Sequence, residues 1–175
     1  MCELTDPEFT AQLEHKQSDI FSMTGYVAYV RNDDKSYYLA CPQESCKRKV
    51  VEEATGWRCE SCNRTYASCV PTYMLSARIS DSSDSQFFNF YRNEGTVLMG
   101  MPAEKLRDLK EQGDIQVINE AYNDRIYRQF TFLVKVRMRP GYGGQEQKVD
   151  YVCCKVMPHS YKNENEMLLK RLKIY

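Results

Sequence analysis

The sequence lacks long apolar runs and an apolar leader. No stretch approaches the roughly 18 consecutive apolar residues that a transmembrane helix needs, so we expect no membrane span in these 175 residues. The opening segment, MCELTDPEFTAQLEHKQ, is polar and acidic, whereas a signal peptide carries an apolar core. These absences predict an intracellular, reducing location, where structural disulfides are rare.

Signatures of catalysis are scarce as well. The chain holds only two histidines, His15 and His159, and neither belongs to the H-E-x-x-H motif of zinc proteases. It has no glycine-rich phosphate loop, and it lacks the H-x-E and P-C-x-x-C pairing of zinc deaminases. We therefore expect a protein that binds and does not catalyse, with an enzyme as the alternative.

The net charge is zero, with 24 basic and 24 acidic side chains, but the charges are unevenly distributed. Residues 1–24 and 103–124 are acidic, whereas residues 126–149 hold five basic side chains against one acid. Binding to nucleic acid depends on a local basic face and not on the total. The neutral total therefore leaves such a partner open, and a solvated strand with scattered charges is the alternative.

Strand signals dominate the rest of the chain. Alternating apolar residues with β-branched and aromatic side chains mark residues 20–31, 36–40, 72–80, 86–91, 127–139 and 148–157. A helix is predicted over 101–113, with Pro102 near its first turn and Gly113 beyond its end, followed by a weaker helical segment. Five main strands with a helix between the third and fourth give the order of an OB-fold, a small Greek-key barrel. We expect an all-β fold class with added helices.

Four of the eight cysteines form two close pairs in CPQESCKRKVVEEATGWRCESC, residues 41–62. The first pair encloses four residues, the second encloses two, and twelve residues separate the pairs. Two knuckles at this separation are typical of a zinc ribbon, in which four thiolates close a tetrahedral structural site. We predict one structural Zn²⁺ on Cys41, Cys46, Cys59 and Cys62. The segment that binds it would be an insertion between the first and second barrel strands. Disulfides or idle thiols are the alternative, and idle or buried thiols are our interpretation of Cys2, Cys69, Cys153 and Cys154.

The strand alternation also selects a candidate DNA-binding face. In QFFNFY, Phe88 and Phe90 share one side and should fill the barrel, so the residues between and beside them point outward. Binding of single strands combines basic side chains for phosphates with exposed rings on which bases stack. The residues that meet these requirements are Arg78, Phe87, Asn89, Tyr91, Lys135, Arg137 and, in the glycine-rich loop of the last hairpin, Tyr142. Packing of Phe87 and Tyr91 under a loop or helix is the alternative.

A final helix is expected near the C-terminal end of the sequence. Asn163 with Glu166 three residues later resembles a capping box. One side of the helix is apolar through Met167, Leu168, Leu172 and Tyr175. Such a stripe has to be covered, either by the chain's own barrel or by a partner.

The segment YYLACPQESCKRKVVEEATGWRCESCNRTY, followed by YMLSARISD, LMG and FTFLVKVRM, resembles the C-terminal DNA-binding domain of the large subunit of replication protein A. The resemblance runs from about residue 20 to residue 172. It implies single-stranded DNA binding, one zinc ion, a nuclear location and a C-terminal helix that joins helices of two smaller OB-fold subunits. It also implies that further OB-folds precede this segment in a longer protein.

The chain departs from this family at two places. A tryptophan usual near Phe87 is missing, since the only tryptophan is Trp57, and the acidic N-terminal segment has no counterpart. These departures leave room for a paralogue dedicated to telomeric single strands or telomerase. A scaffolding OB-fold with little DNA contact and a zinc-ribbon protein of transcription or RNA binding are further alternatives. We expect three parts: an N-terminal extension (1–19), the OB-fold (20–158) and an assembly helix (159–175).

Overall fold

The computed structural model describes residues 18–139 and 148–172. Its main body is a barrel of five long strands: β1 (Ser18–Val30), β6 (Val70–Ser80), β7 (Ser85–Tyr91), β8 (Gln129–Arg139) and β9 (Lys148–Pro158). Around the barrel the order is β1, β8, β9, β7, β6, and β6 pairs back with β1. Only β7 and β9 run parallel among these neighbours. Closure leaves the barrel without open edges, and the expected OB-fold class is confirmed.

The barrel is filled by alternate residues of its strands. Phe132, Val134 and Val136 of β8 are fully buried, as are Phe88 and Phe90 of β7. The ring of Phe132 meets those of Phe88 and Phe90 edge-on at centroid distances of 6.2 and 5.9 Å, a favourable aromatic geometry. The residues between them consequently point outward, which places the predicted DNA-binding side chains on the barrel's outer surface.

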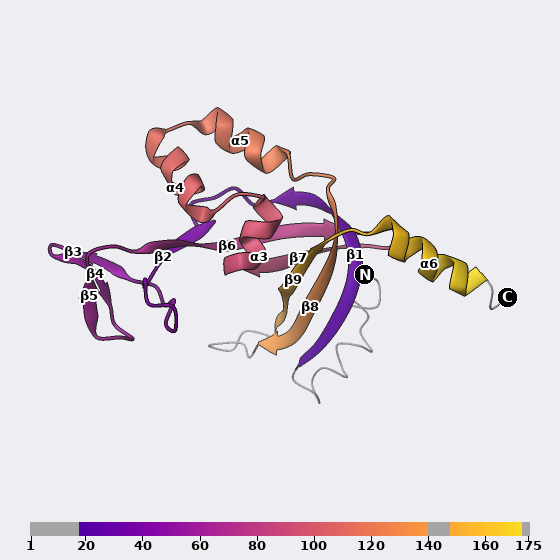
Figure 1. Ribbon diagram of the computed structural model, residues 1–175, viewed down its shortest axis with the longest axis horizontal. Coiled ribbons are helices and arrows are strands. Elements are labelled where there is room, and N and C mark those ends of the chain that lie inside the picture. The colour runs from indigo at the N-terminus through magenta and orange to yellow at the C-terminus, as the bar shows by residue number, and fades with distance from the viewer. Residues whose placement is uncertain (1–17, 140–147, 173–175) are drawn as a thin grey trace.

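Three helices connect β7 to β8 where the sequence predicted one helix and a weaker turn: α3 (Arg92–Met99), α4 (Ala103–Gln112) and α5 (Ile115–Asn123). The predicted helix corresponds to α4, which ends at Gly113 in a left-handed conformation, and the weaker segment corresponds to α5. Helix α3 was missed because its eight residues include a glycine and two β-branched side chains. Figure 1 shows α4 and α5 together on one side of the barrel.

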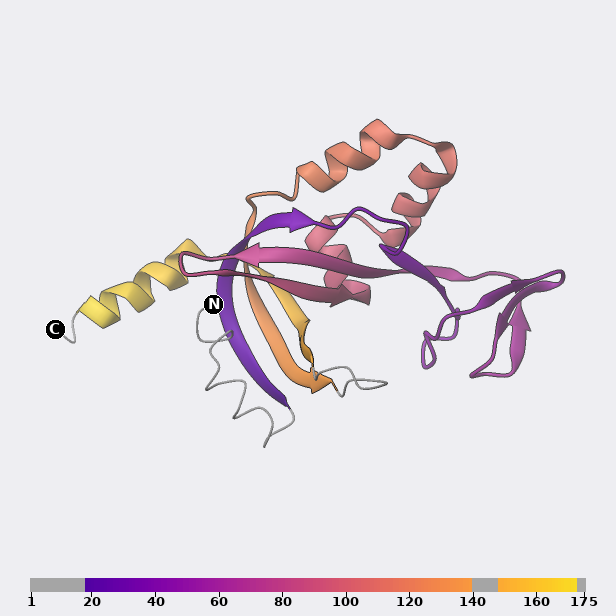
Figure 2. The same cartoon turned by 180° about the vertical axis from the view of Figure 1, so that it is seen from behind.

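Two appendages extend from opposite ends of the barrel (Figures 1 and 2). Strand β2 (Tyr37–Ala40) pairs with the start of β6 and leads into a three-stranded sheet of β3 (Val51–Glu53), β4 (Gly56–Cys59) and β5 (Arg64–Tyr66). This cysteine-bearing insertion lies between the first and second barrel strands, as predicted. The other appendage is α6 (Tyr161–Leu172). Among the described residues, no helix has the length and apolar character required to cross a membrane.

Candidate metal centre and nucleic-acid interface

The four paired cysteines converge on one point. All four Sγ atoms lie within 4.8 Å of one another. The Sγ atoms of Cys41 and Cys62 are 3.9 Å apart, and those of Cys46 and Cys59 are 3.7 Å apart. A tetrahedral site with Zn–S bonds of about 2.3 Å has S···S edges of about 3.8 Å, whereas a disulfide brings sulfurs to about 2.05 Å. The cluster therefore has the dimensions of a metal tetrathiolate and not of two disulfides.

Each cysteine pair is carried by a hydrogen-bonded turn near its second cysteine. The N–H of Cys46 donates to the carbonyl of Gln43 at 3.0 Å, and the N–H of Asn63 donates to that of Glu60 at 3.3 Å. The residue directly after the second cysteine of each pair is left-handed, with φ of 50° at Lys47 and 52° at Asn63. These two rare conformations direct both turns toward the same centre. The spacing of the cysteines predicted the shared centre but not these backbone conformations.

The electrostatics of the cluster favour a cation. A backbone hydrogen bond from Arg48 lowers the pKa of Cys46 to about 7. Interaction with Cys46 raises the pKa of Cys62 to about 12, and burial acts in the same direction. One thiolate therefore forms readily while each further negative charge is opposed by the first. A divalent metal ion removes that opposition, because it binds and stabilises several thiolates together.

The insertion has almost no core besides its cysteines. Its fully enclosed residues are Cys41, Val50 and Cys59, and Trp57 and Tyr66 pack only partly against them. So little buried apolar surface cannot hold a small unit by itself. A bound metal would supply the missing free energy.

The predicted face on β6 and β7 forms an aromatic and basic cluster. Arg78 is the cross-strand partner of Phe87 and is exposed. Phe87 is 37% exposed; the Arg31 guanidinium lies 5.6 Å from its ring centre, and the Tyr29 ring meets it edge-on at 6.5 Å. Phe87 is thus an accessible ring with cations beside it, an arrangement suited to stacking a base between phosphate contacts.

The other predicted residues lie on the same outer face but in different environments. Lys135 of β8 and Asn89 of β7 are both register partners of Val152 on β9, so they form one row across the three strands. Arg137 donates through Nε and Nη2 to Oδ2 of Asp150 at 2.9 and 2.8 Å, and Asn89 donates to Oδ1 of the same carboxylate at 2.8 Å. The charge of Arg137 is therefore already paired, which the sequence did not indicate. Tyr142 lies outside the described residues.

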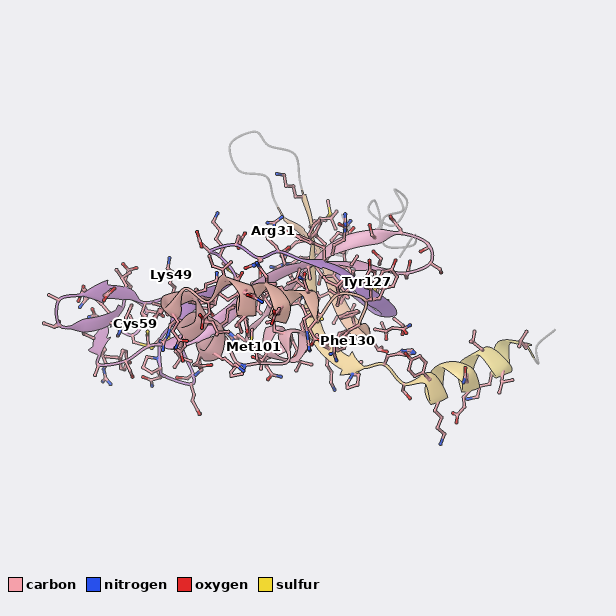
Figure 3. The ribbon with its side chains drawn as sticks, turned by 90° about the horizontal axis from the view of Figure 1, so that it is seen from above. Arg31, Lys49, Cys59, Met101, Tyr127 and Phe130 are labelled. Carbon is pink, nitrogen blue, oxygen red and sulfur yellow. The ribbon has the colours of Figure 1, made fainter. Side chains whose placement is uncertain are left out.

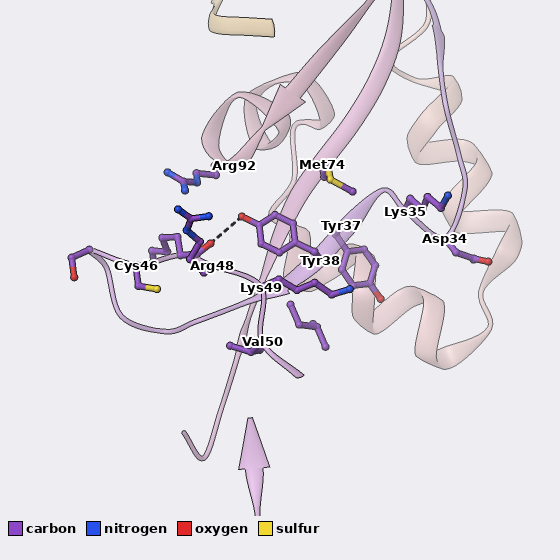
Figure 4. A pocket seen from close by; sticks show the side chains of 13 residues that line it. Asp34, Lys35, Tyr37, Tyr38, Cys46, Arg48, Lys49, Val50, Met74 and Arg92 are labelled. Carbon is purple, nitrogen blue, oxygen red and sulfur yellow. Dashed lines mark hydrogen bonds between the residues drawn. The ribbon is translucent and has the colours of Figure 1, made fainter. Parts of the chain in front are cut away.

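Two connected hollows adjoin this face. A cavity of about 190 Å³ is lined by Asn89 and Tyr91 together with Arg31 and Lys35. It shares Lys35 and Met74 with a groove of about 830 Å³ that runs to the first cysteine turn. Figure 4 shows how the basic side chains of this groove lie around Tyr38, whose hydroxyl donates to the Lys47 carbonyl at 3.1 Å. The basic residues of the groove are Lys35, Lys47, Arg48, Lys49 and Arg92.

The larger groove is lined by five basic side chains and one acid, Asp34. None of its five basic side chains forms an ion pair with another described residue. Seen from above, Arg31 lies over the barrel and Lys49 lies nearer the insertion, with Cys59 beside it (Figure 3). In a chain of zero net charge, such a concentration points to an anionic ligand.

Sequence reasoning missed Tyr29, Arg31, Lys35 and Arg92 as members of this surface. Strict alternation from the buried Val27 would turn Tyr29 and Arg31 inward, and the irregularity of β1 between Val27 and Tyr29 turns them outward instead. Arg92 could not be found by alternation either, because it adopts a left-handed φ of 52° at the junction of β7 and α3. Its side chain reaches the groove only through that unusual backbone conformation.

The helix α6 carries the predicted apolar stripe without cover from the described part of the chain. Leu168 is 47% exposed, Leu172 is 71% exposed, and Leu169, which was not predicted, is 56% exposed. The side chain of Met167 and the whole of Tyr175 lie outside the described residues.

The chain is similar to known proteins along most of its length. Residues 20–168 match the family described as "Replication factor-A C terminal domain". Among curated proteins it is 25% identical over 159 residues to the Xenopus laevis "Replication protein A 70 kDa DNA-binding subunit" and 27% identical over 162 residues to the Schizosaccharomyces pombe "Replication factor A protein 1". These matches cover 90% of this chain but only 26% of each relative, so the chain spans about a quarter of their length.

A solved structure agrees with the fold. A chain of a replication protein A heterotrimer bound to ssDNA superposes with a TM-score of 0.78 at 26% identity, covering 90% of this chain and 36% of that one. A chain of yeast RPA bound to ssDNA gives a TM-score of 0.77 at 24% identity, covering 89% and 85%; at that identity the likeness supports the fold alone.

Proposed function

The chain belongs to the replication factor-A C-terminal domain family, and we propose that it binds single-stranded DNA as part of a replication protein A-like complex. The observation that carries the proposal is the ring-bearing surface that runs from Phe87 to the first cysteine turn and in which basic side chains outnumber acids. The solved relative at 26% identity, a replication protein A heterotrimer, was bound to ssDNA. The function is binding, and no catalytic group is assigned.

The DNA path follows the outer face of the barrel. Bases stack on Phe87 and Tyr91, and phosphates contact Arg78, Lys135 and the basic groove beside Lys47 and Arg92. Asn89 lies between the aromatic and basic parts, and Tyr142 belongs to the adjacent hairpin loop. Arg137 lies on the same face, where its guanidinium is held by Asp150, and this proposal gives it no phosphate contact.

The metal in the proposal is one structural Zn²⁺ on Cys41, Cys46, Cys59 and Cys62. It would neutralise the thiolates and hold the two turns together, so that the Lys47 side of the groove keeps its shape. The fit of the S···S distances to a zinc tetrathiolate and the scarcity of other core in the insertion support this assignment.

The assembly role belongs to the last part of the chain. We assign residues 159–175 to a subunit-assembly helix that packs against two smaller OB-fold subunits, residues 20–158 to the OB-fold and residues 1–19 to an N-terminal extension. Since the relatives are about four times longer than the match, further OB-folds upstream and work in the nucleus on replicating DNA form part of the same proposal.

Titration of a fluorescent oligothymidine by anisotropy, at several salt concentrations, tests the function. We expect binding that weakens with salt and is much tighter than binding of a duplex of the same length. Parallel titration with single-stranded RNA distinguishes the RNA-binding alternative. Equal affinity for duplex and single strand would contradict the proposal.

A further inference from the structure

A single buried carboxylate holds two side chains of the outer face. Asp150 on β9 is only 8% exposed, although it points to the side of the sheet that faces away from the barrel core. Its two oxygens accept hydrogen bonds from Asn89 on one side and from Arg137 on the other. An acid at the centre of a surface proposed to bind a polyanion opposes phosphates, so its presence requires an explanation other than affinity.

The contact fixes the orientation of the Asn89 amide. An asparagine can present either its oxygen or its NH₂ group in a given direction. Here the NH₂ group faces the carboxylate, and the reverse orientation would place the amide oxygen against a negatively charged oxygen. Asp150 therefore permits one orientation only, and the amide oxygen and the second N–H remain for another partner.

Asn89 is one of the residues that line the cavity of about 190 Å³, and Asp33, Arg31 and Lys35 are its charged lining residues. Tyr91 and Met74 supply its apolar wall, and Ser76 is the cross-strand neighbour of Asn89. This space is suited to one planar heterocycle and is too small for a nucleotide chain. No described residue donates a hydrogen bond to the Asn89 oxygen, so this residue of a ring-sized cavity keeps an acceptor and a donor for a ligand.

The same carboxylate removes Arg137 from phosphate binding. Both N–H groups that Arg137 directs toward β9 end on Oδ2 of Asp150, and a paired guanidinium contributes little net charge to the face. Lys135, one row away on β8, has no ion-pair partner among the described residues. Lys135 is thus available for a phosphate of the DNA backbone, whereas Asn89 is available for a base.

We propose that Asp150 is a positioning residue that makes this domain base-selective: it locks the Asn89 amide to read the edge of one unpaired nucleobase in the cavity and withholds Arg137 from the phosphates. The proposal rests on the single-strand binding proposed above. It assigns selectivity to one nucleotide position, and the remaining nucleotides contribute through stacking and charge.

The test is a substitution scan along a bound strand. An oligothymidine of about 12 nucleotides is altered one position at a time to cytosine, adenine or an abasic site, and dissociation constants are measured with the intact chain. For the wild type we expect one position at which the base change alters affinity by roughly five- to 150-fold, the range of a paired donor–acceptor contact. The other positions should vary much less.

Two variants separate positioning from folding. Asn89→Ala should abolish the discrimination at that position without changing the salt dependence. Asp150→Asn should abolish it as well and should also steepen the slope of log affinity against log salt by about 0.7, because a released Arg137 gains one phosphate contact. Asp108→Asn is the matched control, since Asp108 pairs with Arg107 on α4 at 3.0 Å, away from the face, and should change neither quantity.

The outcomes are distinct. A wild-type protein that binds single strands with no position-specific discrimination overturns the base pocket and leaves the proposed function intact. A folded Asp150→Asn protein with unchanged discrimination and slope overturns the positioning role. If this variant does not fold, Asn89→Ala decides alone, since it leaves the Arg137–Asp150 pair in place. Absence of any binding by the wild type would remove the proposed function itself.

Discussion

Gly95 of α3 lies directly against Tyr73 of β6: a Cβ on the glycine would stand 2.4 Å from the Tyr73 Cβ and 3.0 Å from its Cγ. Tyr73 is fully buried, and burial raises the pKa of its hydroxyl well above the usual range. The contact involves atoms next to the backbone, which cannot move aside as the tip of a flexible side chain can. Helix α3 therefore packs on the barrel only because residue 95 has no side chain.

Replacing Gly95 with alanine should destabilise the fold. Alanine is the better helix former by about 1 kcal/mol, but overpacking of this kind costs typically about 1–3 kcal/mol or more, so we expect a net loss of about 1–2 kcal/mol in urea unfolding. Gly113→Ala is the control, because a Cβ there meets nothing within 4 Å and only the left-handed backbone at φ +75° is strained. Equal stability of Gly95→Ala and wild type would show that α3 can shift without loss.

Loss of one metal ligand should loosen the insertion first. Cys59 is fully buried, and Cys59→Ser should reduce bound zinc from one ion per chain to a small fraction and lower the melting temperature by roughly 5–10 °C, about 2–3 kcal/mol in a domain of this size. Metal content is measured by mass spectrometry. Cys154→Ser, which alters an exposed thiol, should keep both values. A wild-type protein without metal and with the same melting temperature would contradict the metal assignment.

The outward rings should contribute directly to affinity. Phe87→Ala and Tyr91→Ala are each expected to weaken oligothymidine binding by roughly 1–3 kcal/mol, the usual value of one base stacked on an aromatic ring. Tyr161→Ala removes a ring that is 66% exposed on α6 and should not affect this assay. If the two face variants fold as the wild type does and bind equally well, bases do not stack on this surface.

The sequence predicted the barrel well because its signal is local. Alternation in QFFNFY identified Phe88 and Phe90 as the residues that fill the interior, and both are fully buried. The cysteine spacing was equally informative, since it predicted that the two pairs share one centre, and all four Sγ atoms lie within 4.8 Å of one another. Both features depend on intervals within the chain.

What the sequence did not reveal depends on contacts between distant segments. The capture of Arg137 by Asp150 joins two strands across a hairpin, and the contribution of Arg92 to the groove depends on one left-handed residue. The place of α3 depends on its fit to Tyr73 rather than on helix propensity. Such features follow from tertiary packing, which periodicity does not encode.

Because Arg137 is paired with Asp150, removing it should affect the salt dependence of DNA binding less than removing the neighbouring Lys135. Lys135→Ala should flatten the salt dependence of single-strand binding by about 0.7 in the slope, as expected for one lost phosphate contact. Arg137→Met should change the slope much less, because its charge is already balanced by Asp150 at 2.8 Å. Both slopes come from the same anisotropy titrations. Equal effects of the two substitutions would show that Arg137 leaves Asp150 when DNA binds.

The exposed leucines of α6 allow the proposed assembly role of this helix to be tested. Leu168, Leu169 and Leu172 are 47%, 56% and 71% exposed, and covering apolar surface is favourable by about 25 cal/mol per Å². Because these side chains contribute little to the chain's own core, Leu168→Asp with Leu172→Asp should alter stability by no more than about 0.5 kcal/mol per site. The same pair should abolish co-purification of the two smaller OB-fold subunits proposed as partners, since a charge in an apolar helix interface is left unpaired. Lys170→Ala on the same helix is the control and should retain the partners. Zinc content should be unchanged in both proteins, which separates loss of assembly from loss of fold. Retention of both subunits by the double variant would place the assembly surface elsewhere on the domain.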